Sequence, residues 1–157
     1  MASKKGIALT AGIAAAIVGS SFLIWYIPQS SPGGPLAPRT DEEVFSDVYG
    51  RSNNLNATIQ LKFDSWKNND TSSDDISTQL ASARSQIGQM KQELASKQPA
   101  QEWKKSYDLY THALDSYTDY LDALKAKIDG GDRTNPDPAL NQKWKELSNQ
   151  SVDAVPI

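Results

Sequence analysis

Three side chains in the third of the predicted helices have the types and the spacing to hold a divalent metal ion. Asp108, His112 and Asp115 form a D-x3-H-x2-D pattern, which helical periodicity places on one face. The heptad phase assigns the buried seam to other residues, such as Tyr107 and Leu114, so we expect the acidic face to point to water. Solvated carboxylates bind metals weakly. We therefore predict no metal site and no cofactor, and a metal-dependent enzyme remains only an alternative hypothesis.

A row of tyrosines lines or flanks the seam of the same helix: Tyr107, Tyr110, Tyr117 and Tyr120. A buried phenol requires a hydrogen-bond partner, and aromatic side chains with a polar end are enriched at protein interfaces. Two roles fit the pattern. The tyrosines are either core residues satisfied by polar neighbours such as Gln79 or Gln86, or a candidate interaction surface.

Motifs of the common enzyme classes are missing from the sequence. The chain has no cysteine, which excludes disulfides, thiolate nucleophiles and the usual structural zinc sites. Glycine-rich phosphate loops, nucleophile elbows and metalloprotease helices do not occur. Two of the 16 Lys and Arg, Lys4 and Lys5, precede the anchor described below, and the other basic residues are outnumbered by 19 Asp and Glu. We expect a protein that is not an enzyme and does not bind nucleic acid.

An uncharged run from Gly6 to Ile27 predicts a transmembrane anchor. As a helix it is long enough to cross about 30 Å of hydrocarbon. The alternative is a cleaved signal peptide, but the apolar part of such a peptide has only about 7 to 15 residues and ends in small residues. This run instead ends in bulky residues that include Trp25 and Tyr26, which suit a membrane interface.

The charges around this run predict its orientation. Lys4 and Lys5 precede it, and no basic residue follows it until Arg39. The positive-inside rule then places residues 1–5 in the cytoplasm and the C-terminal domain on the other side of the cell membrane. Three sequons agree with an extracytoplasmic domain and are candidate glycosylation sites: Asn56, Asn69 and Asn149.

Small residues recur every four positions in the predicted anchor, at Ala8, Gly12, Ala16 and Ser20. In lipid, such a stripe allows another helix to approach closely. The alternative is that a sequence rich in alanine and glycine produces the stripe by chance. On the first interpretation the stripe is a packing face for another membrane protein subunit.

The rest of the chain predicts an all-α domain. Residues 28–39 form a linker rich in Pro, Ser and Gly, residues 40–151 a helical domain, and residues 152–157 a tail. A capping box at Thr40 and Glu43 opens the first helix. The second begins near Ser73 and carries a heptad seam at Ile76, Leu80, Ala83, Ile87, Met90 and Leu94. The third begins around Pro99, and Asp137 caps the last. The short connections favour an antiparallel three- or four-helix bundle.

The stretch KKGIALTAGIAAAIVGSSFLIWYIPQSS, Lys4 to Ser31, resembles the anchors of small membrane proteins of ammonia-oxidising archaea. In particular, it is similar to accessory, helix-rich subunits of the archaeal ammonia monooxygenase. The resemblance implies a complex with polytopic subunits that carry the copper sites, and it assigns no copper ligand to this chain.

We therefore expect a non-catalytic, single-pass accessory subunit that packs in a larger membrane complex through its anchor and its outer bundle. The alternative is an extracytoplasmic ligand-binding or sensory helical bundle. Only five residues precede the anchor, so a sensor of this kind would need a partner to transmit its signal.

Overall fold

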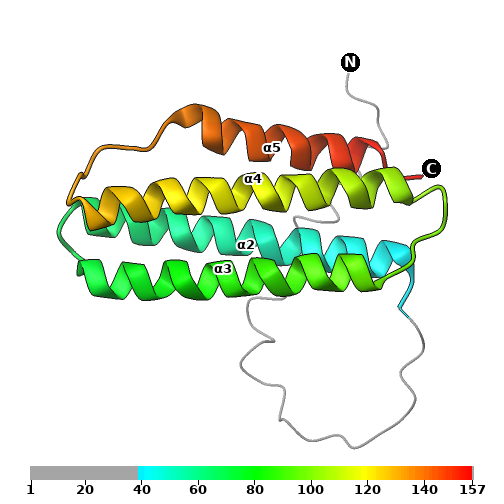
Figure 1. Cartoon of the computed structure of the whole chain (residues 1–157), viewed down its shortest axis with the longest axis horizontal. Helices are drawn as coiled ribbons and strands as arrows, with labels where there is room; N and C mark the ends of the chain where they lie inside the picture. The colour runs from blue at the N-terminus through cyan, green and yellow to red at the C-terminus, as the bar shows by residue number, and fades with distance from the viewer. Residues whose placement is uncertain (1–38, 157) are drawn as a thin grey trace, which may run out of the picture. The chain divides into compact units, whose positions relative to one another are not determined.

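The computed structural model describes residues 39–156, and these residues form four helices and no strand (Figure 1). The helices are α2 (Asp41–Lys67), α3 (Ser73–Ser96), α4 (Lys104–Asp129) and α5 (Pro138–Asp153). The all-α class is confirmed, and the number of helices is four rather than three. No helix within residues 39–156 is both long and apolar enough to cross a bilayer. The predicted anchor and most of the linker, residues 6–38, lie outside the described residues.

Local sequence signals begin three of these helices as predicted. At α2, the Glu43 amide donates to Thr40 Oγ1 (3.1 Å) and the Thr40 amide donates to Glu43 Oε2 (2.8 Å), a reciprocal capping box. The Asp75 amide donates to Ser72 Oγ (3.1 Å) at α3. At α5, Asp137 Oδ1 accepts the amide of Ala139 (2.9 Å).

The predicted start of the third helix near Pro99 is wrong, because α4 begins at Lys104. A tight turn comes first, closed by the Trp103 amide on the Ala100 carbonyl (2.9 Å). The first α-helical hydrogen bond follows from Tyr107 to the Trp103 carbonyl (3.1 Å). Trp103 occupies the N-cap position, and its side chain has no oxygen to accept a helix amide.

The chain divides into two compact units, with the boundary inside α2 between Asn54 and Leu55. In the first unit, the described part of α2 carries local contacts. Asp47 accepts ion pairs from Arg39 (3.3 Å) and Arg51 (2.9 Å), and the ring centroids of Phe45 and Tyr49 lie 6.3 Å apart. The following paragraphs concern the second unit, residues 55–157.

The predicted seams of α3 and α4 are buried. In α3 these residues are Ile76, Leu80, Ala83, Ile87, Met90 and Leu94, and in α4 they are Tyr107, Tyr110, Leu114, Tyr117, Leu121, Leu124 and Ile128. The exposed edge of this helix pair carries two ion pairs, Arg84–Asp122 (2.5 Å) and Lys91–Asp115. From Arg84 to Lys91 the chain runs one heptad forward in α3, whereas from Asp122 to Asp115 it runs one heptad backward in α4. The two helices are therefore antiparallel.

Helix α5 packs against a second face of α4, and this contact is more extensive than the contact between α3 and α4. The rings of Tyr117 and Trp144 are in contact here. Tyr120, one turn after Tyr117 in α4, lines the same pocket as Asn141, one turn before Trp144 in α5. The pair α4–α5 is therefore also antiparallel. Five small side chains of these two helices are buried: Ser106, Ala113, Ser116, Ser148 and Ser151.

Candidate functional site

All four tyrosines singled out from the sequence are buried on α4. Tyr107, Tyr110, Tyr117 and Tyr120 are at most 6% exposed. Their burial agrees with the core role. An interaction with another protein through this row stays a prediction.

Tyr117 packs against Trp144 in the interior, with the two ring planes tilted by 31°. The ring centroids are 4.8 Å apart, and both residues are at most 1% exposed. Neither the Tyr117 hydroxyl nor Trp144 Nε1 has a hydrogen-bond partner among the described residues. Burial, with smaller effects of Tyr120 and Tyr110, raises the pKa of Tyr117 well above its ordinary value.

The predicted glutamine partners of the tyrosines are wrong for Tyr117. Gln79 and Gln86 are exposed on α3, and Gln86 Nε2 donates to Ser82 Oγ (3.3 Å) on its own helix. Heptad phase identifies the buried face of each helix correctly, but it does not show which residues of two helices come opposite each other.

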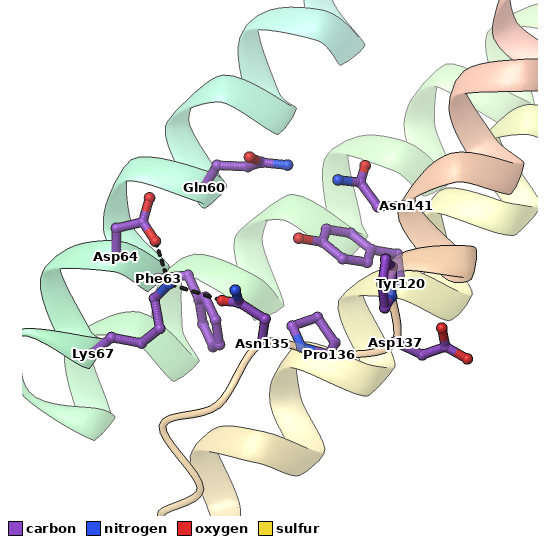
Figure 2. Close-up of a pocket in the computed structure, with 10 residues that line it drawn as sticks. Gln60, Phe63, Asp64, Lys67, Tyr120, Asn135, Pro136, Asp137 and Asn141 are labelled. Carbon is purple, nitrogen blue, oxygen red and sulfur yellow. Dashed lines mark hydrogen bonds and ion pairs between the residues drawn. The ribbon is translucent and has the colours of Figure 1, made fainter.

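Tyr120 faces a pocket of about 230 Å³ that is the principal candidate site (Figure 2). Helix α2 contributes one wall, Tyr120 comes from α4, and the α4–α5 connection and α5 close the opposite side. The lining residues are Gln60, Phe63, Asp64, Lys67, Tyr120, Asn135, Pro136, Asp137, Pro138 and Asn141.

Lys67 binds the two sides of the pocket together. Its ammonium donates to Asn135 Oδ1 (2.8 Å) and forms an ion pair with Asp64 (2.7 Å), as Figure 2 shows, and it lies 5.5 Å from the centre of the Phe63 ring. Arg133 provides a second link between the α4–α5 connection and α2. Its guanidinium lies 4.7 Å from the ring centre of Trp66 and donates a hydrogen bond to the Trp66 carbonyl.

The Tyr120 hydroxyl has no hydrogen bond to a described residue, although the side chain is 94% buried, and in Figure 2 it points into the pocket. Burial first, and then the nearby Asp64 carboxylate, raise the pKa of Tyr120 above its ordinary value. The group is therefore a neutral phenol at physiological pH, able to donate one hydrogen bond and to accept others.

Asp108, His112 and Asp115, the residues of the possible metal-binding pattern on α4, are exposed, and both aspartates form ion pairs. Asp108 pairs with Lys104 (2.7 Å), Asp115 pairs with Lys91, and His112 is exposed. Within residues 39–156, no three His, Cys, Asp or Glu side chains are grouped so that they could hold a metal ion. The basic partners already neutralise the two carboxylates that such a site would need.

The remaining predicted sites are spread over the chain. Asn56 is half-buried on α2, Asn69 is exposed in the α2–α3 turn with φ +67°, and Asn149 is exposed on α5. Their glycosylation stays a prediction. The proposed packing face of the anchor, Ala8, Gly12, Ala16 and Ser20, lies outside the described residues.

The sequence signals did not reveal the pocket residues Gln60, Asn135 and Asn141, which are isolated amides in three different segments. The pocket offers hydrogen-bonding groups and an ion pair between Lys67 and Asp64, an arrangement that suits ligand binding.

No protein-family model matches the chain, and neither a curated protein nor a solved structure is significantly similar to it.

Proposed function

We propose that this chain is a non-catalytic, single-pass accessory subunit of a larger membrane protein complex. The observation that carries the proposal is the uncharged run Gly6–Ile27, preceded by Lys4 and Lys5 and followed by a Pro-rich linker. Such a run supports a membrane anchor, and the charge asymmetry supports an extracytoplasmic position for the helical domain. The archaeal ammonia monooxygenase is the proposed complex, through the resemblance of residues 4–31.

The surface of the helical domain bears on where a partner subunit would bind. Leu61 on α2 is the one large hydrophobic residue that is strongly exposed within residues 39–156. A broad apolar docking face is therefore not available on the described helices. We assign the main contact to the small-residue face of the anchor, with the polar surface of the domain as a weaker second contact.

A pair of leucine substitutions in the anchor tests this contact. Gly12→Leu fills the small-residue stripe, whereas Ala14→Leu adds the same bulk on the opposite side of a helix with about 100° per residue. We expect Gly12→Leu to reduce the yield of co-purifying subunits about tenfold, because close helix packing is lost. Ala14→Leu should leave the yield unchanged. Equal effects of both substitutions, or no effect of either, would contradict the proposed face.

The orientation has its own test, because the chain contains no cysteine. Ser85 is exposed on α3, so Ser85→Cys introduces a single accessible thiol. A membrane-impermeant maleimide should label this thiol in intact cells. Labelling that appears only after lysis would place the domain in the cytoplasm.

A further inference from the structure

The pocket at Tyr120 has unused hydrogen-bonding groups on two of its helices. The Tyr120 hydroxyl has no partner among the described residues although its side chain is 94% buried. Asn141 Oδ1 is also buried without a partner in this part of the chain. A buried polar group without a hydrogen bond is destabilising, so the Asn141 oxygen indicates that an external molecule completes the site. The Tyr120 hydroxyl beside it is accessible from the pocket and can bind the same molecule.

A second amide, from Gln60 on α2, reaches the same space. Figure 2 shows Gln60, Tyr120 and Asn141 pointing toward one another across the pocket. Gln60 Nε2 has only a long hydrogen bond, to Asn56 Oδ1 at 3.5 Å. A molecule in the pocket would therefore meet two amides and a phenol.

Two of the three charged side chains of the pocket, Asp64 and Lys67, are paired with each other, and the third, Asp137, is exposed. The Lys67 ammonium is bonded to Asp64 and Asn135, and Asp137 uses Oδ1 to cap α5. An anionic ligand would find no free cation among the lining residues, so its desolvation would be uncompensated. The groups that remain available for hydrogen bonds, the Tyr120 hydroxyl and the Gln60 and Asn141 amides, are neutral, which favours a neutral ligand.

The volume of the pocket and the rings in its wall narrow the class of ligand further. At about 30 Å³ per water molecule, a volume of 230 Å³ holds roughly seven or eight waters, or one small organic molecule. The rings of Phe63, Pro136 and Pro138 offer apolar surface beside the amides. A hydroxyl group both donates and accepts, so a ligand rich in hydroxyls satisfies a phenol and an amide in either orientation.

We propose that this pocket binds a small neutral polyhydroxy molecule of about the size of a monosaccharide. The Tyr120 hydroxyl and the Gln60 and Asn141 amides bind its hydroxyls, and the Phe63 and Pro136 rings contact its C–H groups. This site goes beyond the accessory role and does not depend on it.

The test uses the full chain in a detergent whose headgroup carries no sugar. Saturation-transfer NMR measures binding of D-glucose, with methylammonium and acetate as charged comparison probes. We expect saturable binding of glucose and none of either ion. Tyr120→Phe, which removes only the hydroxyl, should weaken glucose binding about tenfold, and Gln60→Leu should weaken it as well.

Tyr117→Phe is the matched control, because it removes a buried tyrosine hydroxyl that does not line the pocket. It should leave glucose binding unchanged, and circular dichroism verifies that each variant keeps its helices. Absence of saturable glucose binding, equal loss in Tyr120→Phe and Tyr117→Phe, or preferential binding of one of the ions would overturn the proposal.

Discussion

The rings of Tyr117 and Trp144 pack at a centroid distance of 4.8 Å, yet the Tyr117 hydroxyl and the Trp144 indole N–H lack a hydrogen-bond partner among residues 39–156. This contact joins α4 to α5 at the point where both side chains are fully buried. The packing is favourable and the buried polar atoms oppose it, so the two effects can be separated by substitution.

Tyr117→Phe should stabilise the domain by about 1 kcal/mol, because it keeps the ring and removes a buried hydroxyl without a partner. Trp144→Ala should destabilise it by about 3 to 5 kcal/mol, because it leaves a cavity. Urea denaturation followed by circular dichroism measures both changes. A loss of stability in Tyr117→Phe would show that the hydroxyl has a partner, such as a buried water.

Two ion pairs one heptad apart define the register of α3 against α4. Side chains of Lys91 and Asp115 are 38% and 51% exposed, so we expect a coupling energy below about 1 kcal/mol that decreases with added salt. A double-mutant cycle with Lys91→Met and Asp115→Asn measures it. As a comparison, Lys91→Met combined with Asp122→Asn should show no coupling, since Asp122 pairs with Arg84.

Asp132 in the α4–α5 connection gives a prediction for low pH. A hydrogen bond from Lys127, with further bonds from Thr134, lowers the pKa of Asp132 to about 2. Because the folded-state pKa is lowered, the stabilisation is complete above the unfolded pKa of about 4 and is lost as the pH falls toward 2. Carboxyl NMR titration measures this pKa.

Removal of the Lys127 ammonium, the main donor to Asp132, should reverse the lowering of the Asp132 pKa. In Lys127→Met the pKa of Asp132 should rise toward its ordinary value. In Lys125→Met it should not change, because Lys125 pairs with Asp129 instead. A low pKa of Asp132 in Lys127→Met would be inconsistent with the proposed cause.

The α5 cap provides a stability prediction at the pocket edge. Asp137→Ala should cost about 1 kcal/mol, because the Ala139 amide loses its acceptor, whereas Asp137→Asn should retain most of the cap. Thermal unfolding compares the two variants. Equal stability of both variants and the original chain would argue against the cap.

Local and periodic features of this fold were predictable from the sequence. The α3 and α4 seams followed from their heptad spacing, and the caps at Thr40 and Asp137 followed from residue types that accept helix amides. The late start of α4 was missed because Pro99 suits a first helical turn as well as the turn that precedes one.

The pocket was not predictable, because it depends on the register between helices. Gln60, Tyr120 and Asn141 are far apart in the sequence, and each is an ordinary residue of its own helix. Heptad phase places Tyr120 near the seam but does not select Asn141 as the residue opposite it. The contact between Tyr117 and Trp144 fixes that register, and it involves side chains that sequence periodicity treats only as apolar.

The central claim is that the chain works as part of a membrane complex, and purification from its native membrane tests it most directly. After extraction in a mild detergent, a native gel with mass spectrometry identifies what migrates with the chain. The account predicts a stable complex in which this chain is stoichiometric with polytopic membrane subunits. Migration as a monomer, with no co-purifying subunit, would contradict it.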